Sequence, residues 1–305
     1  MLAAVIVTYN RKNLLAENIE MLLKQSRYID KIFVIDNCST DGTYEFLCNK
    51  GWMASEQFQY IRTGSNIGGA GGFYTGTKAA YEAGADWIIL MDDDGRPCNE
   101  HTIGLLVDHA EAKSADNTAD GKLFINSLVV CGDRLTSKID GMSLIEEAEE
   151  AADNGLLIGS AHPFNGTLIS RKLIEVIGYP NKEFFVKGDE VDYKQRTFDA
   201  GGYVVTLVNS KYYHPYVPTT EKKLFKWVVP VCVEVPWKEY YNARNFTYTY
   251  KKKRRYKMIA FEIVFVKLYA IFTMKCRGGR WNTIKYLFWG LKDGWRGNLG
   301  ANVRP

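Results

Sequence analysis

The feature that most constrains the fold is an apolar run that ends abruptly in three consecutive carboxylates. Residues 87–91 are Trp-Ile-Ile-Leu-Met, and Asp92, Asp93 and Asp94 follow, then a glycine and a nearby proline. The run has the length and composition of a buried strand, and the glycine with the proline is typical of a turn. Because α/β sheets bind ligands at the carboxyl ends of their strands, we expect the three acids at such an edge.

The spacing of these acids predicts a cation site. Alternate side chains of an extended chain share a face, so Asp92 and Asp94 are expected to point together while Asp93 points away. Two like charges held together are unfavourable unless a cation offsets them, and hard divalent cations bind carboxylate oxygens. The alternative is a solvated acidic turn or a helix N-cap, which this stretch alone does not exclude.

The first third of the chain alternates between the two kinds of periodicity. Strands are expected at 2–8, 31–35 and 58–61, and helices at 13–25, from about 44, and at about 74–83. Strict alternation of this kind predicts a doubly wound, mostly parallel α/β sheet. The glycine-rich segment 66–73 fits neither common phosphate-binding glycine pattern. It is either a backbone site for an anionic ligand at a helix start or a flexible turn.

A second group of acids follows the apolar residues 184–186. It consists of Asp189, Glu190 and Asp192 at the start of a predicted helix that runs to Asp199. The helix N-terminus favours the ionised form of Glu190, and an ionised carboxylate at the edge of a site can accept a proton from an attacking hydroxyl. The alternative is a set of acids that only cap the helix.

The charge of the chain is divided unevenly along its length. The net charge is +4, but the part from Lys238 to the end holds 16 Lys or Arg and 3 Asp or Glu, so it carries +13 and the remainder −9. Residues 258–274 are apolar with two internal charges, which is too short and too charged for a membrane span. Basic helices with interleaved aromatics favour an anionic membrane surface. Packing on protein or on a sister subunit is the alternative. Nucleic-acid binding would use the same composition, but no recognition motif appears, so no nucleic-acid partner is expected.

The six cysteines show no paired or metal-type spacing, and the start of the chain shows no cleavable signal sequence. We therefore expect reduced thiols in a cytosolic protein.

Four segments in a fixed order carry a family resemblance. They are Val7–Asn10, Val34–Thr43, Asn66–Gly69 and Met91–Asp94. Together they resemble the nucleotide-sugar-binding half of the family-2 glycosyltransferases, which have a glycosyltransferase A-type (GT-A) fold. The resemblance covers about residues 1–215, and the most similar subgroup is that of the bacterial galactofuranosyltransferase and rhamnosyltransferase-like enzymes.

The resemblance implies a role for each candidate residue. The nucleotide-sugar-binding set is Thr8 and Tyr9 at the base and ribose, Asp36 hydrogen-bonded to the base or ribose, Asn66, Gly68 and Gly69 against the diphosphate, and Asp93 beside them. Asp92, Asp94 and His214 would hold Mn²⁺ or Mg²⁺, although a lone histidine is more often structural. Glu190 matches the catalytic base, a position where many members carry aspartate, so Asp189 remains the alternative.

The resemblance also implies an architecture and an activity. Residues 1–219 would form the GT-A domain, with a nucleotide-sugar half at 1–97 and an acceptor half at 98–219, and 220–305 a basic helical extension. The expected activity is metal-dependent, inverting transfer of galactofuranose from UDP-galactofuranose, or of rhamnose from dTDP-rhamnose, to a lipid-linked saccharide of a cell-surface polysaccharide. The enzyme would be cytoplasmic and peripheral on the inner face of the cell membrane. Its oligomeric state is not predicted, and a homo-oligomer is one of the possibilities. Nucleotidyl transfer and a non-catalytic scaffold are the competing hypotheses.

Overall fold

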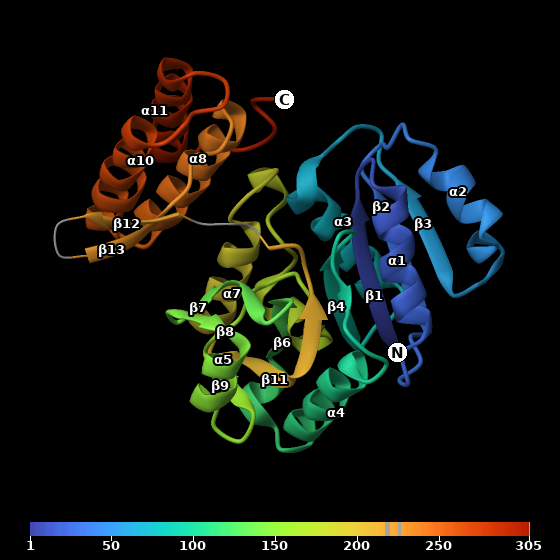
Figure 1. Ribbon diagram of the computed structural model, residues 1–305. Coiled ribbons are helices and arrows are strands. Elements are labelled where there is room, and N and C mark those ends of the chain that lie inside the picture. Colours follow the sequence, from blue (N-terminus) through green and yellow to red (C-terminus); the bar gives the residue numbers. More distant parts are fainter. Residues whose placement is uncertain (217–219, 225–226, 305) are drawn as a thin grey trace. The chain divides into compact units, whose positions relative to one another are not determined.

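The computed structural model describes residues 1–216, 220–224 and 227–304 (Figure 1). The chain divides into two compact units, the first made of Met1–Pro180 with Tyr193–Val217 and the second of Asn181–Asp192 with Pro218–Pro305. The sequence predicted one boundary at residue 219. In the structure the second unit also takes residues 181–192, which the sequence analysis assigned to the catalytic domain.

The first unit is built on a single curled sheet with the strand order β3-β2-β1-β4-β10-β6-β11-β5. Its parallel part consists of β1 (Leu2–Thr8), β2 (Lys31–Asp36), β3 (Phe58–Arg62) and β4 (Trp87–Asp92). The other strands are β5 (Arg96–Pro97), β6 (Leu123–Cys131), β7 (Arg134–Ile139), β8 (Met142–Leu144), β9 (Leu156–Ile158), β10 (Thr167–Ser170) and β11 (Tyr203–Tyr213). Because β10 runs antiparallel to both β4 and β6, the sheet is parallel on one side and mixed on the other.

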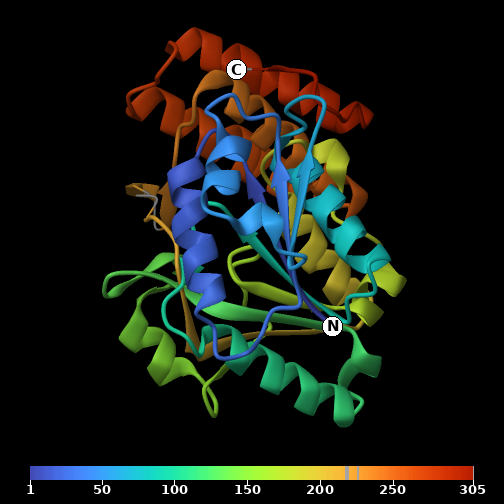
Figure 2. The same ribbon diagram turned by 90° about the vertical axis from the view of Figure 1, so that its right-hand side faces the viewer.

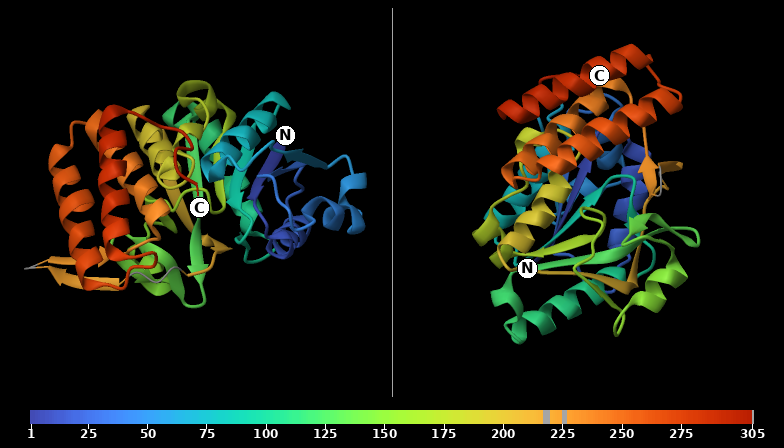
Figure 3. Two further views of the ribbon diagram at one scale, coloured as in Figure 1. Left: turned by 90° about the horizontal axis from the view of Figure 1, so that it is seen from above. Right: turned by 90° about the vertical axis from the view of Figure 1, so that its left-hand side faces the viewer.

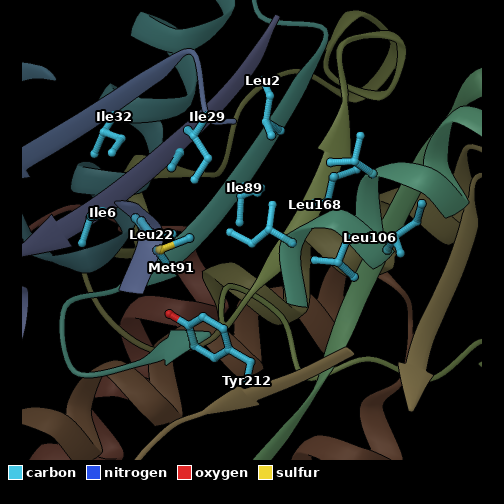
Figure 4. Close-up of a cluster of buried hydrophobic side chains, with 14 of the residues drawn as sticks. Leu2, Ile6, Leu22, Ile29, Ile32, Ile89, Met91, Leu106, Leu168 and Tyr212 are labelled. Atoms are coloured by element: carbon cyan, nitrogen blue, oxygen red, sulfur yellow. The ribbon is translucent and has the colours of Figure 1, made fainter. Parts of the chain in front are cut away.

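Helices cover both faces of this sheet. In the first unit they are α1 (Lys12–Leu23), α2 (Thr43–Asn49), α3 (Gly68–Glu82), α4 (Thr102–Ala115), α5 (Ile145–Ala151), α6 (Arg171–Ile177) and the larger part of α7 (Asp189–Asp199), with the short 3₁₀ helices Trp52–Ala54 and Thr118–Gly121. The 3₁₀ helix Lys182–Phe184 and the first turn of α7 belong to the second unit. Helices α1 and α3 lie on opposite faces of the parallel strands (Figure 2). Figure 4 shows the core cluster on the α1 and α4 side, whose members include Ile6, Leu22, Ile89 and Leu106.

Helix α3 begins six residues earlier than the sequence predicted. We expected residues 66–73 to precede a helix starting near Tyr74, but the glycines form its first turns. A Cβ on Gly72 would lie 2.4 Å from a methyl of Val7, and one on Gly76 would lie 2.2 Å from a methyl of Val5. The prediction was wrong because the glycines are needed for the helix backbone to approach β1. In the sequence, a run of glycines needed for packing looks the same as a loop.

The second unit contains an antiparallel hairpin and a group of helices. The hairpin is β12 (Thr220–Leu224) with β13 (Trp227–Val231), and the helices are α8 (Pro236–Lys252), α9 (Tyr256–Met258), the π-helix Ile259–Val266, α10 (Lys267–Thr273) and α11 (Arg280–Arg296). Helices α8 and α11 lie side by side (Figure 3). In the part of the chain that the structure describes, no helix combines the length and apolar character needed to cross a membrane.

Candidate active site

The first acid group meets a histidine at the edge of the sheet. Asp92 ends β4 opposite Val7 of β1, and His214 follows β11 directly. One ligand atom from each of Asp92, Asp94 and His214 lies within 4.8 Å of the others, and all three residues are partly buried. Two carboxylates and one imidazole are a donor set that suits Mn²⁺ or Mg²⁺. The predicted ligand trio is therefore brought together by the fold.

The hydrogen bonds of His214 leave one ring nitrogen facing the acids. Its Nδ1 lies 2.9 Å from the carbonyl oxygen of Pro215, which can only accept, so Nδ1 carries the proton. Its Nε2 lies 3.4 Å from Oδ1 of Asp94. Burial opposes the charged form of His214, but the hydrogen bond and charge of Asp94 outweigh it and raise the pKa. Burial likewise opposes ionisation of Asp94, whose pKa is nevertheless lowered by His214 and Arg11.

Asp93 is held inside the protein. Its side chain accepts hydrogen bonds from the Thr8 hydroxyl at 2.8 Å and from Nη1 of Arg11 at 3.1 Å. Burial raises its pKa to about 6, against the opposing charge of Arg11. The Thr8 hydroxyl is thus engaged by Asp93, while the side chain of Tyr9 is exposed and its N–H lies 3.4 Å from the same carboxylate. The Thr8 hydroxyl and the Tyr9 main chain therefore contact Asp93, and their place at the base and ribose stays a prediction.

Arg11 was not singled out by the sequence analysis. It precedes α1, and its Nη1 also lies 2.7 Å from Oδ2 of Asp94, so one guanidinium bridges two of the three acids. The signal was present in the sequence, since Arg11 follows the first strand, and neighbouring parallel strands end at the same edge. A cation placed there offsets the repulsion between Asp93 and Asp94.

A hollow of about 370 Å³ opens at the carboxyl ends of β2 and β3. It is lined by Asp36, Ser39, Thr43, Tyr44, Glu45, Tyr60 and Arg62. Asp36 accepts hydrogen bonds from the Ser39 N–H at 2.8 Å and from the Tyr60 hydroxyl. The rings of Tyr44 and Tyr60 lie 4.9 Å apart and offer an aromatic wall. Of these residues only Asp36 was predicted to contact the ligand. The others come close to Asp36 only through the tertiary fold, which the sequence pattern does not show.

The predicted diphosphate residues gather at the amino end of α3. The side-chain oxygen of Asn66 accepts a hydrogen bond from the Gly68 N–H at 2.9 Å, and the Gly68 carbonyl accepts one from Asn37 at 3.0 Å. A Cβ added to Gly69 would meet nothing within 4 Å, so space beside it is open. Helix N-termini attract anions, which agrees with the expected position of a diphosphate.

The second acid group occupies the first turn of α7. Asp189 is buried, whereas Glu190 and Asp192 are partly exposed, and the Asp192 N–H donates to the Gly188 carbonyl at 2.8 Å. Of the two candidates for the base, Glu190 is thus the more accessible. All three acids belong to the second unit, so the structure assigns them to the same unit as α8 and α11.

Comparison with known proteins identifies the family. The family model described as glycosyl transferase family 2 matches residues 3–129. Galactofuranosyltransferase GlfT1 of Mycolicibacterium smegmatis is 31% identical over 215 residues, which is 70% of each chain. The chain belongs to glycosyl transferase family 2. The resemblance stated from the four ordered motifs is therefore confirmed, and the protein is a glycosyltransferase.

Two further comparisons extend over nearly the whole chain. The dTDP-rhamnosyl transferase RfbF of Shigella flexneri is 25% identical and covers 98% of this chain and 96% of its own. The structure of a mannosyltransferase from Pyrobaculum calidifontis, in complex with GDP-Man and Mn²⁺, superposes with a TM-score of 0.54 at 15% identity over 97% of this chain and 87% of that one. At that identity the structural likeness supports the fold alone, and it confirms the predicted GT-A class.

Proposed function

We propose that this glycosyltransferase is metal-dependent and inverting, and that it transfers galactofuranose from UDP-galactofuranose to a lipid-linked saccharide in cell-surface polysaccharide synthesis. The observation that carries the metal dependence is the approach of Asp92, Asp94 and His214 to within 4.8 Å of one another at a strand end. The similarity to galactofuranosyltransferase GlfT1 supports the donor sugar.

The first unit would bind the donor. Asp92, Asp94 and His214 would hold Mn²⁺ or Mg²⁺, which when bound offsets the negative charge that develops on the departing nucleoside diphosphate. The hollow beside Asp36 would take the uracil, since Tyr44 and Tyr60 supply a ring wall and Asp36 supplies a hydrogen-bond acceptor. The open backbone at the amino end of α3 would receive the diphosphate.

Glu190, in the first turn of α7, would supply the base. The Glu190 carboxylate accepts the proton of the acceptor hydroxyl as that oxygen forms a bond to the anomeric carbon. The bond from the anomeric carbon to the diphosphate oxygen breaks, and its electron pair leaves with the nucleoside diphosphate, so one displacement inverts the anomeric configuration. Glu190 is preferred over Asp189 because Asp189 is only 4% exposed.

The similarity to the rhamnosyltransferase RfbF supports a second donor, dTDP-rhamnose, with the same site and mechanism. The purified protein should therefore be assayed with Mn²⁺ and a panel of nucleotide sugars, with nucleoside diphosphate release as the readout and Asp94→Ala as the control. Release of UDP from UDP-galactofuranose alone supports the proposal, and a response to dTDP-rhamnose alone replaces the donor. Pyrophosphate release, or silence across the panel without nucleotide binding, overturns the proposed transfer.

An anionic membrane surface on the cytoplasmic side would bind the second unit. Its helices expose aromatic side chains at Tyr256, Phe265, Phe272, Trp281, Phe288, Trp289 and Trp295. Exposed Lys and Arg side chains lie among them, including Lys257, Lys275, Lys285 and Lys292. This combination fits an anionic bilayer interface, where a lipid-linked acceptor would be presented. Co-sedimentation with phosphatidylglycerol vesicles but not with phosphatidylcholine vesicles is expected. Equal binding to both, or a stable oligomer that hides the aromatics, argues against it.

A further inference from the structure

The chain adopts an unusual backbone directly before Glu190. Phe185 has φ 64° and ψ −62°, and the Val186 N–H donates to the Phe184 carbonyl at 2.7 Å, which together define a γ-turn of the rare and strained hand. Lys187 and Gly188 follow with φ of 68° and 86°. Left-handed conformations at two non-glycine residues so close together persist only where the surroundings enforce them.

Asn245 of α8 is the main partner of this turn. Its side-chain Nδ2 lies 3.0 Å from the carbonyl oxygens of Phe184 and Val186 and 2.7 Å from that of Lys187. The residue is fully buried. An amide has two N–H donors, so three carbonyl oxygens converging on one amide nitrogen share those donors. The Asn245 side chain thus provides hydrogen bonds to three carbonyl groups of the strained turn.

Arg244, the preceding residue, holds the beginning of the same turn. Its Nη2 donates to the carbonyls of Glu183 and Phe184, both at 2.9 Å, and its Nε donates to the side-chain oxygen of Asn245 at 2.8 Å. The guanidinium is fully buried and lies 4.7 Å from the ring centroid of Tyr241. A buried cation is retained only where its donors are satisfied. Here the acceptors are two carbonyls of the turn, the Asn245 side chain and the Gly300 carbonyl.

We propose that Arg244 and Asn245 are positioning residues for glycosyl transfer, because they fix the strained turn that sets where α7 begins and so where Glu190 projects. The inference rests on the proposed role of Glu190 as the base. Helix α8 would thus contribute to glycosyl transfer. The sequence analysis predicted only membrane binding or packing for this part of the chain. Neither residue touches the reacting atoms, so both act through Glu190.

The test is Asn245→Ala, which removes the amide and keeps a good helix former in α8. We expect kcat for transfer to fall by about 10- to 100-fold with the KM for the donor unchanged, because small displacements of a reacting group cost about this much. Metal-dependent binding of UDP should be unaffected. Tyr250→Phe is the matched control, since it removes a hydrogen bond from α8 to the Glu262 carboxylate and lies six residues beyond Arg244. It should lower the melting temperature and leave kcat unchanged.

A double-mutant cycle with Glu190→Gln separates positioning from general loss of structure. If Asn245 acts through Glu190, Asn245→Ala should cost less than about twofold once the base is absent, with residual transfer followed by radiolabelled donor. An equal loss in both backgrounds, or full activity of Asn245→Ala, overturns the inference. Should Asn245→Ala not fold, Arg244→Lys keeps the buried cation, loses the forked donors, and should give the same pattern. A fully active Glu190→Gln enzyme would instead refute the base itself, which distinguishes the two failures.

Discussion

The two acid groups of this enzyme are held in place in different ways. Asp92, Asp93 and Asp94 stand at the end of a central buried strand, and their supports, Thr8 and Arg11, come from the neighbouring strand and the turn that follows it. Their place is thus a direct consequence of strand register, which a parallel sheet fixes strongly because both of its faces are buried.

The second acid group depends on contacts distant in sequence. Asp189 and Glu190 follow a strained turn whose carbonyls are held by Arg244 and Asn245, some 60 residues further along the chain. The first acid group is thus organised by a sheet edge, and the second by side chains of a separate helix. Remote substitutions should therefore disturb the second group much more readily than the first.

The largest expected effect is that of Asp94→Asn, which removes one of the three potential metal ligands. It should lower transfer by about 10³-fold or more, because a metal ion supplies several kcal/mol of charge stabilisation. It should also abolish the Mn²⁺ dependence of UDP binding, measured by titration calorimetry. Retention of metal-dependent binding would place the cation elsewhere.

The Glu190→Gln substitution should separate the chemical step from donor binding. Transfer should fall by about 10²-fold or more through loss of the proton acceptor, while metal-dependent UDP binding stays at the wild-type level. Asp189→Asn is the companion variant. If it were the one that abolished the pH dependence of kcat on the acidic side, the base would be reassigned to Asp189.

The acid group at the sheet edge was easier to predict from the sequence than the acid group at the start of α7. The strands β1, β2 and β4 and the meeting of Asp92 with Asp94 were predictable, because apolar runs of strand length ended in polar residues and parallel strands share an edge. His214 was placed by family resemblance rather than by pattern, since a lone histidine after a strand has no periodic signal.

The features that were missed all depend on tertiary contacts. The early start of α3 was hidden because glycines needed for packing against Val7 resemble a loop in sequence. The assignment of residues 181–192 to the second unit could not be predicted, since it follows from carbonyls held by Arg244 and Asn245. Because every residue has a main-chain carbonyl, the type of the accepting residue does not reveal such a hydrogen bond. The spacing of residues in the sequence does not reveal it either.

Arg11→Gln addresses the support of the first group. The guanidinium orients Asp93 and Asp94, and partners that orient metal ligands typically contribute about 10- to 100-fold to metal affinity or activity. We expect the apparent Mn²⁺ affinity to weaken by about 10-fold, with Arg11→Lys intermediate. Tighter Mn²⁺ binding in Arg11→Gln would mean that the arginine competes with the metal instead.

Two glycine substitutions compare the packing of the units. A Cβ on Gly294 of α11 would lie 2.3 Å from the Arg244 carbonyl oxygen, which is backbone, whereas a Cβ on Gly72 of α3 would first meet a Val7 methyl. Because a side chain can adjust and a helix backbone cannot easily do so, Gly294→Ala should cost more stability than Gly72→Ala. We expect about 2 kcal/mol for the former, measured by urea unfolding. The reverse order would show that the sheet unit is the less adaptable of the two.

The smallest expected effect concerns the ion pair that flanks the strained turn. Nζ of Lys187 lies 3.0 Å from a carboxylate oxygen of Glu234, and both belong to the second unit. Burial opposes ionisation of Glu234, but Lys187 outweighs it and lowers its pKa from the usual value near 4.5. The pKa of Lys187 is raised above its usual 10.5 by Glu234, against the effect of burial.

These directions fix the sign of the pH dependence. The stability contributed by Glu234 is present above about pH 4.5 and is lost as the pH falls through its lower folded-state pKa, while that of Lys187 persists to above pH 10.5. Because Lys187 is more than a third exposed, the pair should contribute about 1 kcal/mol or less. Glu234→Gln should therefore lower the free energy of unfolding at pH 7 by that amount and approach the wild type below pH 4. A gap that widened on acidification would contradict the pairing, and the turn would then depend on Arg244 and Asn245 alone.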